Sequence, residues 1–377
     1  MTALRTDVDP DGLLEYSVVF TDRSLNHMSK TFQTVMRDLS GLLKQVYAAE
    51  AVALVPGGGT YAMEATARQI ARDETVLVIR NGWFSYRWSQ IFAAGDLPAE
   101  EIVLSARRAG NGASAPFAPP PIEEAVETIR RHRPAAVFAP HVETSAGLIL
   151  PDDYIAALAD AVHDVGGVLV LDCIASGCVW VDMAATGVDV LISAPQKGWS
   201  ASPAAGCVMM SARGAERVRA RSSDSFAMDL GKWLSIMEAY EGGGHAYHAT
   251  MPTDALVTFR DAMEETRARG FAEAKAAQHE LGRRVREALA ARGQASVAAQ
   301  GFGAPGVVVC YTDRDDVKSG AAFAAEGMQI AAGVPLQVGE GEGFKTFRVG
   351  LFGLDKLDDV DGAVERFETV LDRVFAA

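Results

Sequence analysis

Short runs of apolar residues alternate with longer amphipathic stretches over most of the chain. A run that is apolar at every position is typical of a strand covered on both faces, as in a mostly parallel sheet. The intervening stretches, such as YAMEATARQIARD and DDYIAALADAVHDVG, carry apolar residues at helical spacing and therefore predict helices. Seven strands are predicted, over residues 51–55, 76–80, 101–105, 135–139, 168–172, 189–193 and 206–211.

This alternation predicts an α/β fold, with a mostly parallel seven-stranded sheet flanked by helices. The pattern changes near residue 255, where a long helical stretch precedes the apolar runs GVVVCYT and KTFRVGLFG and a last amphipathic helix. The change predicts a smaller C-terminal α+β domain. We place an N-terminal segment at 1–20, a large domain at 21–258 and a small domain at 259–377.

Composition and charge exclude several classes of protein. The net charge of −14 over 377 residues argues against nucleic acid and anionic membranes as partners. No apolar run is long enough to cross a bilayer, and the first residues lack the apolar stretch of a secretory signal. The four cysteines form neither a CxxC pair nor a metal-ligand spacing with histidine, so we expect buried thiols, a cytoplasmic enzyme and no metal.

The strongest chemical signal comes from Asp172 and Lys197. Asp172 is the last residue of one predicted strand, and Lys197 lies in SAPQKGW, the loop after the next strand. A lone lysine in a loop would be an ordinary solvated cation. Paired with an aspartate at a neighbouring strand end, it suits pyridoxal phosphate: the lysine forms a Schiff base with the cofactor aldehyde, and the aspartate keeps the pyridine nitrogen protonated.

A glycine-rich turn, PGGGTYAMEA, follows the first predicted strand and begins a helix. Its glycines let the backbone approach an anion, and the helix N-terminus offers N–H groups and a favourable dipole. Gly59 and Thr60 are therefore predicted to hold a phosphate, although such turns are also common without a ligand. The turn lacks the GK[ST] of a nucleotide P-loop, and Ala62 stands where a dinucleotide fingerprint has its third glycine.

Three further segments carry candidate chemistry. NGWFSYRW places aromatic rings after a strand, where one could stack on a pyridine. PHVETSAG places Glu143, Thr144 and Ser145 at another strand end, where α/β sheets bind ligands. Arg348 lies within an apolar strand and suits capture of a substrate carboxylate. The structural alternatives are core aromatics for the first segment and a salt bridge for Arg348.

Taken together, these motifs resemble the class V aminotransferases of the type I pyridoxal-phosphate fold, most closely the alanine–glyoxylate and serine–pyruvate group. The resemblance covers about residues 20 to 370 and rests on GGGTYAMEA, NGWFSYR, VETSAG, DCIASG, SAPQKG, KW at 232–233, YHATMP and FRVG. It implies pyridoxal 5′-phosphate as cofactor and a homodimer with a shared active site. Its implied residues are Lys197 for the Schiff base, Asp172 for the pyridinium, Gly59, Thr60 and Gln196 for the phosphate, Phe84 and Ala175 on the two faces of the ring, Ser145 for the ring hydroxyl, Arg348 for the substrate carboxylate, and Tyr247 and Thr250 reaching the phosphate of the other subunit.

The resemblance implies transfer of an amino group from a small amino acid, such as alanine or serine, to glyoxylate or pyruvate. Thr60 departs from the histidine often found in the alanine–glyoxylate branch, and GGGT is closer to the phosphonate-transaminase branch. Phe84 replaces a tryptophan, and the N-terminal segment at the substrate entrance lacks the usual PGP opening. A 2-aminoethylphosphonate-type transaminase therefore stays open.

Two further alternatives have other chemistry. A lyase or epimerase could use the same fold and cofactor, whereas a desulfurase would need a mobile cysteine, and the cysteines here lie in or next to strands. A nicotinamide-dependent oxidoreductase or a non-catalytic domain is disfavoured by the missing third glycine and by the Asp172–Lys197 pair.

Overall fold

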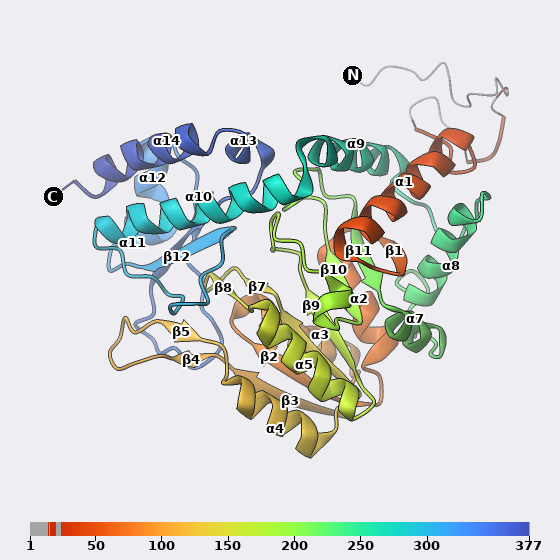
Figure 1. The fold of residues 1–377 in the computed structure, drawn as a ribbon, viewed down its shortest axis with the longest axis horizontal. Helices are drawn as coiled ribbons and strands as arrows, with labels where there is room; N and C mark the ends of the chain where they lie inside the picture. The colour runs from red at the N-terminus through yellow and green to blue at the C-terminus, as the bar shows by residue number, and fades with distance from the viewer. Residues whose placement is uncertain (1–13, 15, 20–23, 377) are drawn as a thin grey trace.

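The computed structural model describes residues 14, 16–19 and 24–376, so most of the predicted N-terminal segment 1–20 lies outside the described residues. All seven predicted strands are present and form one sheet in the order β1-β11-β10-β9-β6-β2-β3, which confirms the predicted α/β architecture (Figure 1). These strands are β1 (Ala51–Pro56), β2 (Thr75–Arg80), β3 (Glu100–Ser105), β6 (Ala136–Pro140), β9 (Val168–Asp172), β10 (Val190–Ser193) and β11 (Ala205–Met210).

The sheet is parallel from β10 to β3, and β11 runs antiparallel to both of its neighbours, β10 and β1. Strands β6, β9, β10 and β11 are buried along their whole length, as expected for strands covered on both faces. Parallel strands end at the same edge of a sheet, and ligands of α/β proteins bind at that edge. Asp172, at the end of β9, therefore lies at the edge where a site is expected.

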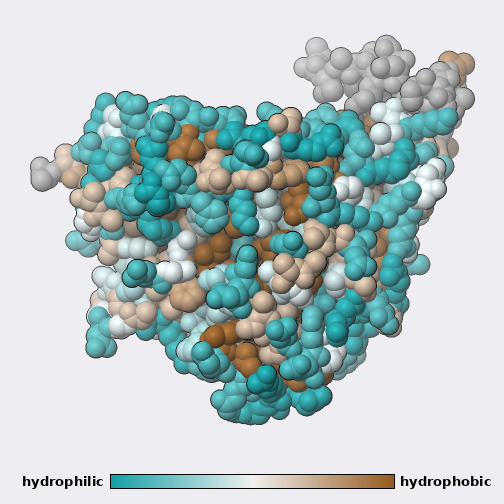
Figure 2. Space-filling view, in the orientation of Figure 1, coloured by the Kyte–Doolittle hydropathy of each residue, from teal (hydrophilic) through white to brown (hydrophobic). Residues whose placement is uncertain are grey.

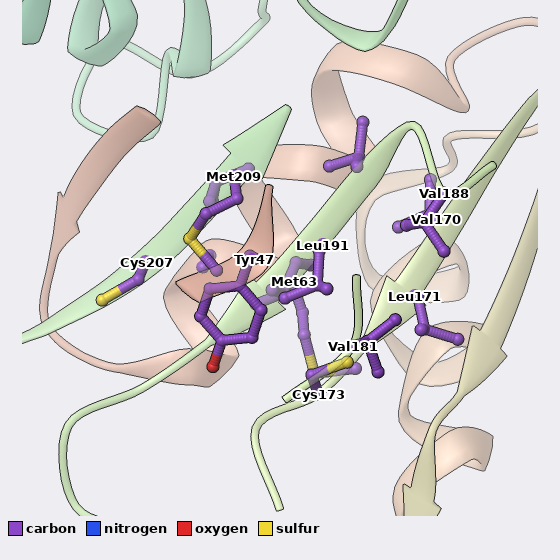
Figure 3. Close-up of a cluster of buried hydrophobic side chains, with 14 of the residues drawn as sticks. Tyr47, Met63, Val170, Leu171, Cys173, Val181, Val188, Leu191, Cys207 and Met209 are labelled. Carbon is purple, nitrogen blue, oxygen red and sulfur yellow. The ribbon is translucent and has the colours of Figure 1, made fainter. Parts of the chain in front are cut away.

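Helices cover the sheet and complete its core. They are α1 (Lys30–Tyr47), α2 (Gly59–Ile70), α3 (Trp83–Gly95), α4 (Ile122–His132), α5 (Asp152–Asp164), α6 (Met183–Thr186), α7 (Ala212–Arg219) and α8 (Leu230–Glu241). Figure 3 shows how side chains from α1, α2 and the central strands pack together, among them Tyr47, Met63, Leu191 and Met209. The outer face in Figure 2 is mainly hydrophilic, with apolar residues in small separate patches.

Gly206 in β11 allows the start of α2 to pack closely against the sheet. A Cβ atom at this position would lie 2.3 Å from the Cβ of Ala62 and 2.8 Å from the carbonyl oxygen of Gly58. Real side chains do not pack that closely, so only glycine allows this approach of strand and helix. The glycine-rich turn before α2 is thereby held at the same edge of the sheet as Asp172.

The C-terminal part contains the two predicted apolar runs as strands. Its antiparallel sheet has the order β12-β14-β13, formed by β12 (Val307–Tyr311), β13 (Ala331–Ala332) and β14 (Thr346–Gly350). Position 258, the predicted domain boundary, falls inside a continuous helix, and the division into domains stays a prediction. The surrounding helices are α9 (Thr253–Arg269), α10 (Phe271–Ala291), α11 (Asp315–Ser319), α12 (Ala321–Ala325), α13 (Leu354–Leu357) and α14 (Val360–Val374).

Two small hairpins connect the parts of the molecule. They are formed by β4 (Arg107–Arg108) with β5 (Phe117–Ala118), and by β7 (Val142–Glu143) with β8 (Leu148–Ile149). An apolar cluster that includes Val142, Leu148, Val307 and Val309 joins the second hairpin to β12, next to the edge of the large sheet. In the part of the chain that the structure describes, no helix is long and apolar enough to span a membrane.

Candidate active site

A cavity of about 520 Å³ lies at the carboxyl edge of the parallel strands and is also lined by residues of β12 and β14 of the C-terminal part. Such a volume is in the range of cavities that bind small molecules and cofactors. Eight of the eleven predicted site residues line it: Gly59, Thr60, Phe84, Asp172, Ala175, Gln196, Lys197 and Arg348.

The glycine-rich turn leaves backbone groups open to the cavity. Gly57 has a φ of +121°, a conformation that L side chains rarely adopt, and Gly58 offers no side chain to cap the helix. A Cβ atom at Gly59 would lie 2.5 Å from the Ile174 side chain. The first amides of α2 have no acceptor within the helix, so this turn can receive an anion.

Gln196 adds a polar side chain to the same wall. Its Oε1 atom is buried and has no hydrogen-bond partner among the described residues. The oxygen and nitrogen of an amide are interchangeable by a half-turn, which would place the NH₂ group at the unpaired position. A donor there fits a phosphate, and a buried polar atom without a partner is costly unless a ligand satisfies it.

Asp172 is a buried carboxyl group, 7% exposed, at the end of β9. Its Oδ1 accepts a hydrogen bond of 2.9 Å from the amide of Ile174. Burial raises the pKa of Asp172 to about 7, and the nearby Glu143 acts in the same direction, while the Ile174 amide and Arg87 oppose the shift. A buried carboxyl with a raised pKa is stabilised in its ionised form by a cationic partner, such as a protonated ring nitrogen.

Lys197 is half-buried, and its ammonium nitrogen lies 5.1 Å from the centroid of the Phe352 ring. Burial lowers the pKa of Lys197, and the positive charge of Arg348 lowers it further. A lowered pKa increases the share of neutral amine, which is the nucleophilic form. Burial and the nearby charge of Arg348 thus both favour the form of Lys197 that can bond to an aldehyde.

Arg348 is also half-buried, in β14. Its Nε donates a hydrogen bond of 2.8 Å to the carbonyl oxygen of Ala332, and its guanidinium carbon lies 5.6 Å from the centroid of the Phe84 ring. Burial lowers the pKa of Arg348, and Glu143 opposes this shift. The described residues form no salt bridge with Arg348, so the structural alternative for it is not supported, and its charge is available for an acidic ligand.

The structure places Ser145 behind the cavity wall. Ser145 is fully buried, its hydroxyl donates a hydrogen bond of 2.7 Å to Glu143, and it accepts one of 2.9 Å from the amide of Trp83. The adjacent Thr144 lines the cavity instead. The turn at the strand end thus directs the Thr144 side chain toward the cavity and the Ser145 side chain away from it, and the contact of Ser145 with a ring hydroxyl stays a prediction.

Tyr247 and Thr250 do not line the cavity of their own chain. They lie in the segment between α8 and α9, where the Tyr247 side chain is 61% exposed and the two hydroxyl oxygens are 3.4 Å apart. Their predicted contact with the phosphate of another subunit stays a prediction.

Two residues of the site carry roles that the sequence analysis did not assign. Arg87 lines the cavity, and its Nη1 donates a hydrogen bond of 3.2 Å to the Thr60 hydroxyl. Its position, one helical turn after Phe84, could have indicated a cation on the same face of α3 as the aromatic ring.

Glu143 is the second such residue, and it is fully buried. Its carboxylate accepts five hydrogen bonds, from the amides of Phe84, Ser85 and Ser145 and from the hydroxyls of Ser85 and Ser145, at 2.7 to 3.2 Å. Three of the five partners are backbone amides, which can only donate. Glu143 neutralises the start of α3 and so holds Phe84, the next residue of the cavity wall, in position.

Residues 14–334 match the family model described as Aminotransferase class-V, and the chain belongs to this family. Among curated proteins it is similar to a 2-aminoethylphosphonate–pyruvate transaminase of Paraburkholderia phymatum, 29% identical over 358 residues that cover 94% of this chain and 90% of the relative. It is also similar to 2-aminoethylphosphonate–pyruvate transaminase 2 of Paraburkholderia xenovorans, 30% identical over 345 residues, or 88% and 86% of the two chains.

Solved structures agree with this assignment. The fold is similar to that of an alanine–glyoxylate aminotransferase of Nostoc sp., with a TM-score of 0.76 and 25% identity over 92% of this chain and 89% of the other. An aspartate aminotransferase of Thermus thermophilus gives a TM-score of 0.75 and 26% identity over 93% of both chains. The predicted family, the type I fold and transaminase activity are thus confirmed, and the chain is an enzyme rather than a non-catalytic domain.

Replacement of Glu143 by Gln is expected to destabilise the protein. The amide nitrogen would face hydrogen-bond donors inside a fully buried pocket, so we expect a loss of about 3 kcal/mol in the free energy of unfolding. Urea denaturation of the cofactor-free protein measures this loss of stability. Asp152→Asn, in the exposed first turn of α5, is the matched control and should cost less than about 1 kcal/mol. Equal losses in the two variants would contradict the role of Glu143.

The raised pKa of Asp172 predicts that the stability of the cofactor-free protein falls as pH rises. An unfolded aspartate ionises near 3.8 and the folded Asp172 near 7, so the folded state holds more protons between these values. Relative to Asp172→Asn, the wild type should lose up to about 4 kcal/mol between about pH 4 and pH 8. Urea denaturation across this range tests it, and parallel pH profiles for the two proteins would refute it.

Proposed function

We propose that this chain is a pyridoxal-phosphate-dependent aminotransferase in which Lys197 bonds to the cofactor aldehyde. The observation that supports this most directly is the shared cavity of Lys197 and Asp172. An amine with a lowered pKa, a buried carboxyl and a glycine-rich helix start face the same space. Arg348 adds a cation with no salt bridge among the described residues, as an acidic substrate requires.

The residues present fit pyridoxal phosphate at each of its polar groups. The first turn of α2 with Gly59, Thr60 and Gln196 would hold the phosphate, and Asp172 would hold the ring nitrogen in its protonated form. Phe84 would stack on the ring, a contact worth about 1 kcal/mol. When bound, the cofactor supplies an electron sink for bonds broken at the α-carbon of the substrate.

In this mechanism Lys197 transfers the proton and Arg348 binds the substrate. With the cofactor bound, the Nζ of Lys197 would be the group that takes the proton from the donor's α-carbon. The lowered pKa of Lys197 favours the neutral amine, the form that acts as a base, and the same amine would also be placed to return the proton. Arg348 binds the acidic group of the substrate and orients the α-carbon toward Lys197.

The proposed substrates are a small amino donor and a 2-oxo acid. Alanine or serine as donor, with glyoxylate or pyruvate as acceptor, follows from the family resemblance. The second candidate donor is 2-aminoethylphosphonate, which is favoured by the activity for which the two relatives are named and by the GGGT turn at Gly57–Thr60. In either case the second substrate is an oxo acid of similar size.

We further propose a cytoplasmic homodimer with shared active sites. Tyr247, in the segment before α9, is 61% exposed, and Tyr61, next to the glycine-rich turn, is 55% exposed. Residues that meet a second copy would have such exposure in a single chain. The four cysteines are free, buried thiols, which suits a reducing compartment.

Lys197→Ala is expected to abolish turnover, by more than about 10³-fold, because the variant lacks both nucleophile and base. Borohydride treatment followed by mass spectrometry should attach the cofactor to the wild type but not to the variant. Lys318→Ala, at an exposed lysine of α11, is the control and should behave like the wild type. A Lys197→Ala protein with wild-type turnover would exclude the proposal. Single turnovers with alanine, serine and 2-aminoethylphosphonate, followed by visible absorbance, then decide between the candidate donors.

Mixed dimers test the shared site. Lys197→Ala and the double variant Tyr247→Ala/Thr250→Ala should each be inactive or impaired alone. A dimer of one chain of each kind would contain one intact site, so mixing after dissociation should restore about a quarter of wild-type activity. No gain on mixing would contradict a contribution of Tyr247 and Thr250 to the other subunit's site.

A further inference from the structure

We infer that Arg87 is the counter-charge for the cofactor phosphate and binds it together with Thr60 and the start of α2. The inference rests on the proposed function and extends the set of residues that hold the cofactor. It follows from the position of Arg87, from the neutrality of the other groups at the glycine-rich turn and from the distribution of charge in the cavity.

Arg87 is held beside the turn by two contacts. Its Nη1 donates a hydrogen bond to the Thr60 hydroxyl at 3.2 Å, and its guanidinium carbon lies 5.3 Å from the centroid of the Phe84 ring. Thr60 is in the first turn of α2, so the cation of α3 stands directly at the N-terminus of the neighbouring helix. The contact with Thr60 uses one of five N–H groups and leaves the others free to donate to an anion.

The other groups at the turn carry no formal charge. They are the backbone amides of Gly58 and Gly59, the hydroxyl of Thr60 and the amide of Gln196. A phosphate monoester carries about −1.5 to −2 charges near neutral pH, and a partly buried charge of that size is costly without a cation nearby. A helix N-terminus supplies only about half a positive charge.

The remaining charges of the cavity have other partners. Under the proposed function, Lys197 would bond to the cofactor aldehyde and Asp172 would pair with the ring nitrogen. Arg348 approaches Phe84 from the C-terminal part of the molecule, with its guanidinium carbon 5.6 Å from the ring centroid. Arg87 is therefore the cation that remains to bind the phosphate, while Arg348 binds the acidic group of the substrate. No salt bridge to Arg87 occurs among the described residues, so its charge is not already neutralised.

Titrations of cofactor-free protein with pyridoxal 5′-phosphate and with pyridoxal, which lacks the phosphate, test this inference. Arg87→Gln should weaken pyridoxal 5′-phosphate binding by about 10- to 100-fold, the effect of one charge-assisted hydrogen bond, and change pyridoxal binding less than about 2-fold. Arg87→Lys keeps the charge and should retain part of the affinity. Inorganic phosphate should raise the melting temperature of the wild type more than that of Arg87→Gln.

Arg348→Gln is the matched control, since it removes the other guanidinium next to Phe84. It should leave the binding of pyridoxal 5′-phosphate within about 2-fold and raise the KM for the 2-oxo acid. Circular dichroism of the cofactor-free variants verifies that they fold, and Arg87→Lys provides the comparison if Arg87→Gln does not.

Three outcomes would overturn the inference. Equal losses for pyridoxal and pyridoxal 5′-phosphate would give Arg87 a general structural role. Unchanged cofactor affinity with a raised KM for 2-aminoethylphosphonate would make it a substrate anchor. Unchanged cofactor affinity and unchanged KM would give it neither role. A wild type that binds no pyridoxal 5′-phosphate would instead refute the proposed function, so the two failures are distinguishable.

Discussion

The site depends on the alignment of the parallel strands. Asp172 is paired in register with Pro140 of β6 on one side and with Ile192 of β10 on the other. The chain leaves these three strands at the same edge of the sheet, and each exit brings a segment to the candidate site: Glu143 and Thr144 after β6, Ala175 after β9, and Gln196 with Lys197 after β10. The hydrogen-bond ladder of the sheet thus fixes the spacing between segments that are far apart in sequence.

Charge is distributed unevenly around the cavity. Arg87, Lys197 and Arg348 line it, whereas its only lining carboxyl among the described residues is Asp172. Glu143 lies behind the wall and contributes its field without contacting the cavity. An excess of cations in a half-buried space costs energy unless anions occupy it, and a phosphate and a substrate acid together supply such anions.

Burial has a second effect, since it moves the pKa of Asp172 and that of Lys197 toward neutrality, where proton transfer is most effective.

Much of this could be predicted from the chain alone. The seven strands were predictable because a strand covered on both faces is apolar throughout. Asp172 and Lys197 stood out because one ends such a run and the other lies in the loop after the next run. The glycine-rich turn was recognisable from its composition. Thr144 was not distinguished from Ser145, because the two are adjacent hydroxyl residues and only the path of the turn decides which faces the cavity. Arg87 was not assigned, since an arginine in a helix is ordinary at the level of sequence. Glu143 was expected at a strand end, but its hydrogen bonds with the start of α3 were not, since they depend on how that helix packs.

The sequence by itself determined the order and type of the elements and pointed to Lys197, Asp172 and the glycine-rich turn as the candidate site, because these depend on local patterns of a few residues. The tertiary structure decided which charges face one another. The hydrogen bonds of Glu143 with α3, the contact of Arg87 with Thr60 and the approach of Arg348 to Phe84 join segments separated by many residues. Such contacts arise only when strands align and helices pack, so no local pattern encodes them.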